Sequence, residues 1–96
     1  MTKEDIKRAI RENKHILKKY KIKSISLFGS YVRNEQKEGS DIDFWVDFEE
    51  PTYDNLINLV FFLEELLKHK VEVVSEGGVS PYIEPYIRKE LEKIET

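Results

Sequence analysis

The sequence predicts an α/β (α+β) fold in which helices flank a small mixed three-stranded sheet. Three short runs are expected to form strands, at 22–28, 41–48 and 71–75, and the first two alternate as strands with one buried face do. Segments with apolar residues near the 3.6-residue period of a helix flank and separate them, at 2–20, about 51–69 and 85–94. The expected order is helix, strand, strand, helix, strand, helix, which is a sheet with helices packed against it.

Residues 2–20 are expected to form the first helix. Thr2 is a suitable N-cap, and the acidic residues that follow favour the positive end of the helix dipole. The apolar residues near the helical period are Ile6, Ala9, Ile10, Ile16, Leu17 and Tyr20. The strand over 22–28 follows this helix and ends at Gly29.

A mostly polar connection over 30–40 leads to the second strand, with a turn expected at 38–40. The strand over 41–48 alternates strictly. One face carries Ile42, Phe44, Val46 and Phe48. The opposite face carries Asp41, Asp43, Trp45 and Asp47. The apolar face is therefore expected to pack on the core, and the aspartates to lie on the other face.

The second helix is expected from Pro51 to about His69. Its core stripe consists of Leu56, Leu59, Val60, Leu63, Leu66 and Leu67. Three further apolar residues, Ile57, Phe61 and Phe62, lie off this stripe. Two interpretations remain open: another helix or the C-terminal segment packs on them, or they form a surface for a partner or a second copy.

The third strand, 71–75, is followed by a loop at Gly77-Gly78 and a loose turn over 81–84. Because proline is tolerated only in the first turn of a helix, we expect the last helix to begin at Pro85 and to continue to about Ile94.

Composition limits the function classes. The 96 residues are 40% hydrophobic and 36% charged, which is typical of a single folded domain. There is no cysteine, so disulfides and cysteine-ligated zinc are excluded. No apolar run reaches the roughly 20 residues of a membrane span, so we expect no membrane association and a cytoplasmic location. The net charge of -3 argues against nucleic-acid binding, although lysines crowd the segment 14–23.

Asp41 and Asp43 are the strongest candidates for chemistry. In a strand they point the same way, about 6.5–7 Å apart, so flexible carboxylates can converge on one cation. Oxygen ligands of this kind suit Mg²⁺ or Mn²⁺ with substrate phosphates completing the coordination. The pair could also be a solvated surface that discourages aggregation of an edge strand, and the Asp-x-Asp spacing alone does not decide between the two.

Gly29-Ser30, at the end of the preceding strand, could hold the phosphates. Glycine lets the backbone approach an anion closely. Ser30 can donate from its hydroxyl and its N–H, and a helical turn that begins there would favour phosphate. The first strand would then hold a phosphate tail beside a metal on the second.

Taken together, Gly29-Ser30, a spacer of ten residues and Asp41-Ile42-Asp43 resemble the signature of the nucleotidyltransferase superfamily related to DNA polymerase beta. The stretches GSYVRNEQKEGSDIDFWVDF and VEVVSEGGVSPYIEPYI are similar to its minimal nucleotidyltransferase branch. The resemblance covers most of the chain. It implies the nucleotidyltransferase fold and a single minimal nucleotidyltransferase domain, 1–96.

The resemblance also implies a metal site. In that superfamily the two strand aspartates hold a divalent metal, and a carboxylate on a later strand completes the site. This implies that Asp41, Asp43 and Glu72 are the catalytic and metal-binding residues. The branch more commonly carries Asp at the position of Glu72, and the additional methylene alters the reach of the carboxylate toward an acceptor.

For the nucleotide, the resemblance implies that Gly29 and Ser30 bind phosphate. Arg33 falls where relatives often carry an arginine, which can contact phosphate through two donors. A surface arginine paired with Glu35 is an equal alternative.

The activity that the resemblance implies is metal-dependent transfer of AMP from ATP to a hydroxyl. Small proteins of this branch resemble antitoxins of toxin-antitoxin pairs, in which the acceptor is a tyrosine of a HEPN-domain ribonuclease toxin. The alternative is a non-catalytic antitoxin that neutralises its partner by contact alone. A homo-oligomer is compatible with either interpretation.

Overall fold

The computed structural model describes residues 1–96. Its helices are α1 (Lys3–Glu12), α2 (His15–Lys19), α3 (Tyr53–Leu67) and α4 (Glu84–Glu90). Its strands are β1 (Ile22–Phe28), β2 (Ile42–Phe48), β3 (Val71–Ser75) and β4 (Glu92–Lys93). The strands form one mixed sheet in the order β3-β2-β1-β4, in which only the β2–β3 pair is parallel.

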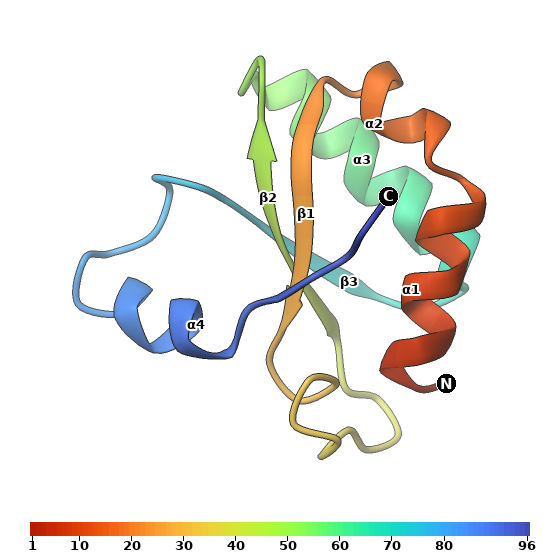
Figure 1. The fold of residues 1–96 in the computed structure, drawn as a ribbon, viewed down its shortest axis with the longest axis vertical. Coiled ribbons are helices and arrows are strands. Elements are labelled where there is room, and N and C mark those ends of the chain that lie inside the picture. Colours follow the sequence, from red (N-terminus) through yellow and green to blue (C-terminus); the bar gives the residue numbers. More distant parts are fainter.

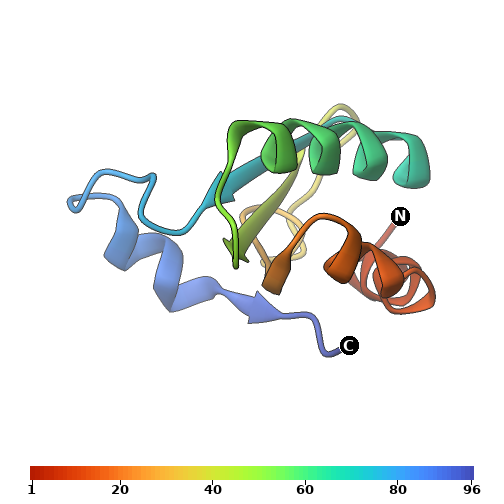
Figure 2. The same cartoon turned by 90° about the horizontal axis from the view of Figure 1, so that it is seen from above.

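The helices lie on both sides of the sheet (Figure 1). Helices α1, α2 and α3 cover one face, and α4 lies on the other side, as the view from above also shows (Figure 2). The apolar face of β2 lies in the core beneath α3, as predicted from its alternation, with Ile42, Phe44 and Val46 fully buried. The aspartates of β2 therefore face the side of the sheet on which α4 lies.

The predicted helix over 2–20 is two helices. Thr2 caps α1 as expected: its Oγ1 accepts from the Asp5 N–H at 3.3 Å, and its N–H donates to Asp5 Oδ2 at 2.9 Å. At Asn13 the side chain donates to the Ala9 carbonyl at 2.8 Å and the helix ends. Ile16 stands six positions after Ile10, roughly 120° away on a continuous helix. The break lets both side chains enter the core, where each is at most 1% exposed.

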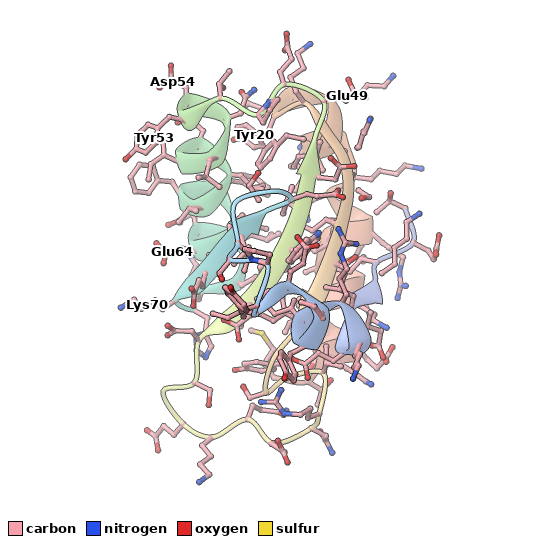
Figure 3. All side chains as sticks on the ribbon, turned by 90° about the vertical axis from the view of Figure 1, so that its left-hand side faces the viewer. Tyr20, Glu49, Tyr53, Asp54, Glu64 and Lys70 are labelled. Atoms are coloured by element: carbon pink, nitrogen blue, oxygen red, sulfur yellow. The ribbon has the colours of Figure 1, made fainter.

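The off-stripe residues of α3 have different surroundings. The Phe62 ring packs against Tyr20, with centroids 6.0 Å apart, so the segment after α2 covers this part of the helix. Phe61 is 63% exposed, and Tyr53 at the start of α3 is 75% exposed. Figure 3 shows Tyr53 at one end of α3 and Glu64 near the other. Glu64 accepts a hydrogen bond from the Val71 N–H and so connects the helix to β3. No helix combines the length and apolar character that crossing a membrane requires.

The last helix ends earlier than predicted, and the sheet has four strands rather than three. Helix α4 includes Pro85 in its first turn, as expected, but stops at Glu90. The chain then pairs with β1 as β4, and Ile94, which donates its N–H to the Ile25 carbonyl at 3.0 Å, is buried. Burial of Ile94 and pairing with β1 outweigh the few further hydrogen bonds that a longer helix would make.

Replacing Ile94 with alanine should therefore lower the free energy of unfolding by about 2–4 kcal/mol, because it leaves a cavity at a fully packed position. Lys93→Ala, one residue earlier and exposed, should change it by less than about 0.5 kcal/mol. Urea unfolding followed by circular dichroism measures both. Equal stability of the two variants would show that β4 does not contribute to the core.

Candidate functional site

Asp43 lies at the centre of the predicted site. It is on the second residue of β2, where the antiparallel partner is Phe28 and the parallel partner is Glu72 of β3. The register therefore places the end of β1, the start of β2 and the start of β3 side by side. Asp41 lies one residue before β2 and is half-buried. The sheet thus brings together the three carboxylates that the sequence analysis singled out.

The carboxylates repel one another. Partial burial raises the pKa of Asp43 to about 6, and the negative charges of Glu72 and Asp41 add to this shift. A hydrogen bond to Glu72 also favours the protonated form, whereas Arg33 opposes the shift. A site with this charge balance is stabilised by a cation.

The arrangement suits a divalent metal in its donor chemistry, since it offers carboxylate oxygens only and the charge of each raises the cost of ionising the others. The side chains do not yet form a group of three that surrounds one point in the manner of a closed metal site. A metal site that keeps open positions for substrate needs no such closed cage. The donor chemistry of Asp41, Asp43 and Glu72 is therefore that of a magnesium or manganese site, and metal binding by these three residues stays a prediction.

The pKa of Asp43 leads to a prediction about stability. Its folded-state pKa of about 6 lies above the unfolded value of about 3.9, so the folded protein binds more protons between these two pH values. Stability should therefore fall as the pH rises through this window. At neutral pH, Asp43→Asn should unfold at a higher temperature than the wild type without metal, and the gap should close toward about pH 4.

Added Mg²⁺ should raise the unfolding temperature of the wild type and leave that of Asp43→Asn nearly unchanged, because the variant lacks a negative ligand. Differential scanning calorimetry with and without Mg²⁺ measures both effects. An equal metal response of the two proteins would exclude Asp43 from the metal site.

Gly29 has a conformation that explains its residue type. Its φ is +81°, in the left-handed region that favours glycine, and the side of its Cα where a Cβ would stand is taken by the Asp43 carboxylate. Its carbonyl accepts from the N–H groups of Val32 and Arg33, at 3.1 and 3.3 Å, and so forms a tight turn. The backbone thus passes directly over the carboxylate with no side chain between.

Ser30 is the first residue of this turn, which is not long enough to be a helix. Its carbonyl accepts from the Glu35 N–H at 2.9 Å, and its N–H has no backbone partner. The N–H and the hydroxyl of Ser30 can therefore donate to an anion bound beside the Gly29 turn.

Arg33 pairs with Glu35, as one of the two interpretations held, at 2.7 Å from Nε to Oε1. It also donates from Nη1 to Glu90 Oε2 of α4 at 2.7 Å. The hydrogen bonds from Arg33 to Glu35 and Glu90 raise its pKa further. Glu90 also accepts the Gly29 N–H at 3.0 Å through Oε1. Sequence reasoning did not single out Glu90, because nothing in the spacing of α4 connects it to a loop sixty-one residues away.

Trp45 and Asp47 continue the same face of β2. The Trp45 ring is buried and packs within the chain, with the Arg88 guanidinium of α4 5.2 Å from its centroid. His69 and the Tyr31 hydroxyl form a hydrogen bond of 3.0 Å. Nothing in the sequence alone connects these two residues. Neither His69 nor His15 lies among the carboxylates.

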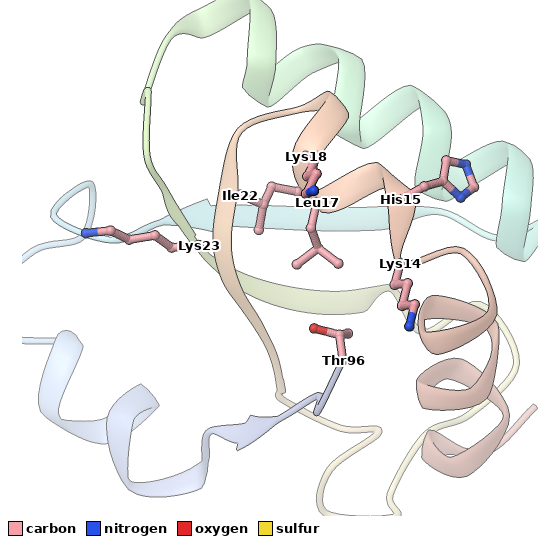
Figure 4. A pocket seen from close by; sticks show the side chains of 7 residues that line it. All are labelled: Lys14, His15, Leu17, Lys18, Ile22, Lys23 and Thr96. Atoms are coloured by element: carbon pink, nitrogen blue, oxygen red, sulfur yellow. The ribbon is translucent and has the colours of Figure 1, made fainter.

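The one cavity lies elsewhere. It has a volume of about 500 Å³ and is lined by Lys14, His15, Leu17, Lys18, Ile22, Lys23 and Thr96 (Figure 4). Ile22 begins β1, whereas Gly29 follows its other end, so this hollow and the carboxylates are separated by the length of the strand. The candidate site lies where β1 ends and β2 and β3 begin, with Asp41 and Asp43 half-buried.

Comparison with known proteins places this geometry in a family. The family model described as nucleotidyltransferase domain matches residues 6–94. A Methanocaldococcus jannaschii protein assigned as a protein adenylyltransferase is 48% identical over 93% of this chain and 90% of its own length. The protein adenylyltransferase MntA of Thermococcus cleftensis is 37% identical over 95% of this chain and 94% of its own.

Solved structures agree on the fold. One assigned as a minimal nucleotidyltransferase is 30% identical, with a TM-score of 0.81 over 100% of this chain and 97% of its own. A toxin-antitoxin structure with AMP-PNP (TM-score 0.75, 23% identity, 93% and 72% covered) has the same fold. So does a complex of a tri-AMPylated Shewanella oneidensis HEPN toxin with an MNT antitoxin (TM-score 0.68, 19% identity, 94% and 71% covered).

These matches extend over nearly the whole chain and over both halves of the site. The turn at Gly29 and the carboxylates of β2 and β3 lie within the matched residues. The chain therefore belongs to the nucleotidyltransferase domain family, in its minimal branch, and is a nucleotidyltransferase.

Proposed function

We propose that this nucleotidyltransferase transfers AMP from ATP to a hydroxyl of a partner protein, with release of pyrophosphate. The observation that carries the proposal is the approach of the Gly29 turn to the Asp43 carboxylate, beside Glu72. N–H groups that can bind phosphate thus lie next to carboxylates that can bind a metal, at the end of the sheet where β1 ends and β2 and β3 begin. Relatives that cover nearly the whole chain are named protein adenylyltransferases, which supports AMP as the transferred group.

Each site residue then has a role. The N–H groups of Gly29 and Ser30, with the Ser30 hydroxyl, hold the β- and γ-phosphates. Asp41, Asp43 and Glu72 hold Mg²⁺ or Mn²⁺, which when bound supplies positive charge beside the α-phosphate. Glu72 aligns the acceptor hydroxyl and accepts its proton. The acceptor oxygen forms a bond to the α-phosphorus while the bond from that phosphorus to the bridging oxygen breaks and pyrophosphate leaves.

The open shape of the site supports a protein acceptor. Glu72 is exposed, and Asp41 and Asp43 are half-buried at the ends of the strands, so a tyrosine presented by another protein has access to this group. The exposed rings of Phe61 and Tyr53 on α3 offer apolar surface for such a partner or for a second copy. A toxin-antitoxin complex of this fold contains an AMPylated HEPN toxin, which supports a HEPN toxin as the acceptor protein. The proposed acceptor residue is a tyrosine of that toxin.

The alternative is an antitoxin that neutralises its partner by contact alone. One observation favours it: the Gly29 N–H and Arg33 are already bonded to Glu90. The resemblance adds that Glu72 stands where the branch more commonly carries Asp. Under this alternative the partner would be neutralised without ATP.

The test is to co-express the chain with candidate HEPN partners, purify the complex, and incubate it with Mg²⁺ and ATP labelled at the α-phosphate. We expect label in the partner, lost when the modified tyrosine is replaced by phenylalanine. Ribonuclease inhibition that needs neither ATP nor Asp43 would instead establish the contact-only alternative.

A further inference from the structure

The Glu90 carboxylate occupies the two strongest donors of the phosphate site. Its Oε1 accepts the Gly29 N–H at 3.0 Å, and its Oε2 accepts Arg33 Nη1 at 2.7 Å. Both oxygens of one carboxylate thus bridge a backbone N–H and a guanidinium, which is how a phosphate group is bound by such donors. The carboxylate reaches this place from α4, sixty-one residues later in the chain.

The donors are also correctly placed for the nucleotide. Gly29 touches the Asp43 carboxylate on the side where a Cβ would stand, so an anion on its N–H lies next to the proposed metal ligands. In that position Glu90 adds a negative charge close to the carboxylates of Asp41, Asp43 and Glu72. Gly29 and Arg33 therefore hold the Glu90 carboxylate, while the neighbouring carboxylates repel it. Another anion that binds the same two donors could thus replace it.

Polar contacts hold helix α4 against the rest of the domain. None of its residues is buried, and it lies alone on its side of the sheet (Figure 2). Besides Glu90, α4 contacts the sheet through Arg88, whose guanidinium lies 5.2 Å from the Trp45 ring centroid and donates to Glu76, directly after β3, at 3.1 Å. Because α4 contributes no residue to the hydrophobic core, moving the Glu90 carboxylate away from Gly29 leaves that core intact.

We propose that Glu90 is an internal competitor for the β- and γ-phosphates, so that it sets which nucleotides the site accepts; this rests on the proposed function. A ligand must carry enough negative charge to displace a carboxylate from Gly29 and Arg33. ATP with Mg²⁺ does so through its terminal phosphates. AMP has no group that reaches these donors and leaves Glu90 in place.

The variant that tests this is Glu90→Gln, which keeps the shape of the side chain and removes its charge. With Gln, the bond from the Gly29 N–H joins two neutral groups and becomes about half as strong, and Arg33 loses the negative charge of its partner on α4. Glu90→Gln should therefore bind Mg²⁺·AMP-PNP roughly five- to tenfold more tightly than the wild type does. The affinity for AMP should stay within about twofold. Isothermal titration calorimetry measures both.

Glu35→Gln is the matched control. Glu35 also holds Arg33, at 2.7 Å, but does not touch Gly29. If removing a negative charge near Arg33 were sufficient, both variants would tighten AMP-PNP binding equally, and the inference would be overturned. Equal or weaker binding by Glu90→Gln would also overturn it, with the proposed function intact.

A measurement on the wild type needs no variant to fold. In ¹⁵N-labelled protein, Mg²⁺·AMP-PNP should shift the amide resonances of Gly29 and of 84–90 together, since α4 must leave the turn. Resonances of α4 that stay unchanged while Gly29 shifts would refute displacement of Glu90. Absence of any nucleotide binding by the wild type and by Glu90→Gln would overturn the proposed function and this inference together.

Discussion

Asp43→Asn should lower the rate of AMP transfer by about a thousandfold or more while the protein still folds. Electrostatic stabilisation of the transferring phosphate by metal and its ligands contributes several kcal/mol, and each 1.36 kcal/mol is tenfold in rate. Asn has nearly the same size and takes the same place on β2, but it removes one of the three negative charges, the other two being those of Glu72 and Asp41. Steady-state kinetics with labelled ATP measure the loss.

Asp47→Asn is the matched control, because Asp47 lies on the same face of β2, four residues further along and opposite Ser24. It should retain activity within about threefold, as expected of a surface substitution away from the site. Equal activity of the two variants would mean that Asp43 contributes no more to catalysis than Asp47 does, and the metal site would have to lie elsewhere.

Gly29→Ala should be the most damaging change at the phosphate turn. A Cβ there would overlap the Asp43 carboxylate, and the positive φ of +81° adds strain for any L-residue. We expect a loss of about 1–3 kcal/mol in stability from the strain. We also expect a loss of about a hundredfold or more in activity, because Asp43 is pushed from its position. Urea unfolding and transfer assays separate the two effects.

Gly39→Ala isolates the strain. Gly39 has a similar φ of +87° in the same connection, yet a Cβ there would meet nothing within 4 Å. It should lose about 1 kcal/mol in stability and keep full activity. If Gly39→Ala and Gly29→Ala lost activity equally, the effect would come from stiffening the connection and not from the approach to Asp43.

The strands were the best-predicted part of the molecule. The alternation of 41–48 gave β2 its buried face, because one residue of slippage would have placed Asp43 in the core and Phe44 in water. The break of the first helix could have been suspected at Asn13, whose side chain competes for backbone hydrogen bonds. The short strand β4 could not be predicted, because Ile94 also continues the helical spacing of Ile87 and Leu91, and only contact with β1 decides between them.

The candidate site, too, was predicted only in part. The end of the first strand and the start of the second were predicted to bind one substrate, and the antiparallel pairing of β1 with β2 brings Gly29 into contact with the Asp43 carboxylate. Glu72 was suggested by resemblance, and the parallel register places it beside Asp43. Glu90 was missed because its role depends on where α4 rests against the turn. Its spacing within α4 gives no indication of that contact.

The most direct test of the central claim is to compare ATP labelled at the α-phosphate with ATP labelled at the γ-phosphate, using the purified protein, Mg²⁺ and its co-purified partner. Nucleotidyl transfer predicts that the α-label enters the partner and that the γ-label leaves as pyrophosphate, both depending on Asp43. Entry of the γ-label into the partner, or release of the γ-label as inorganic phosphate without transfer of the α-label, would contradict the account.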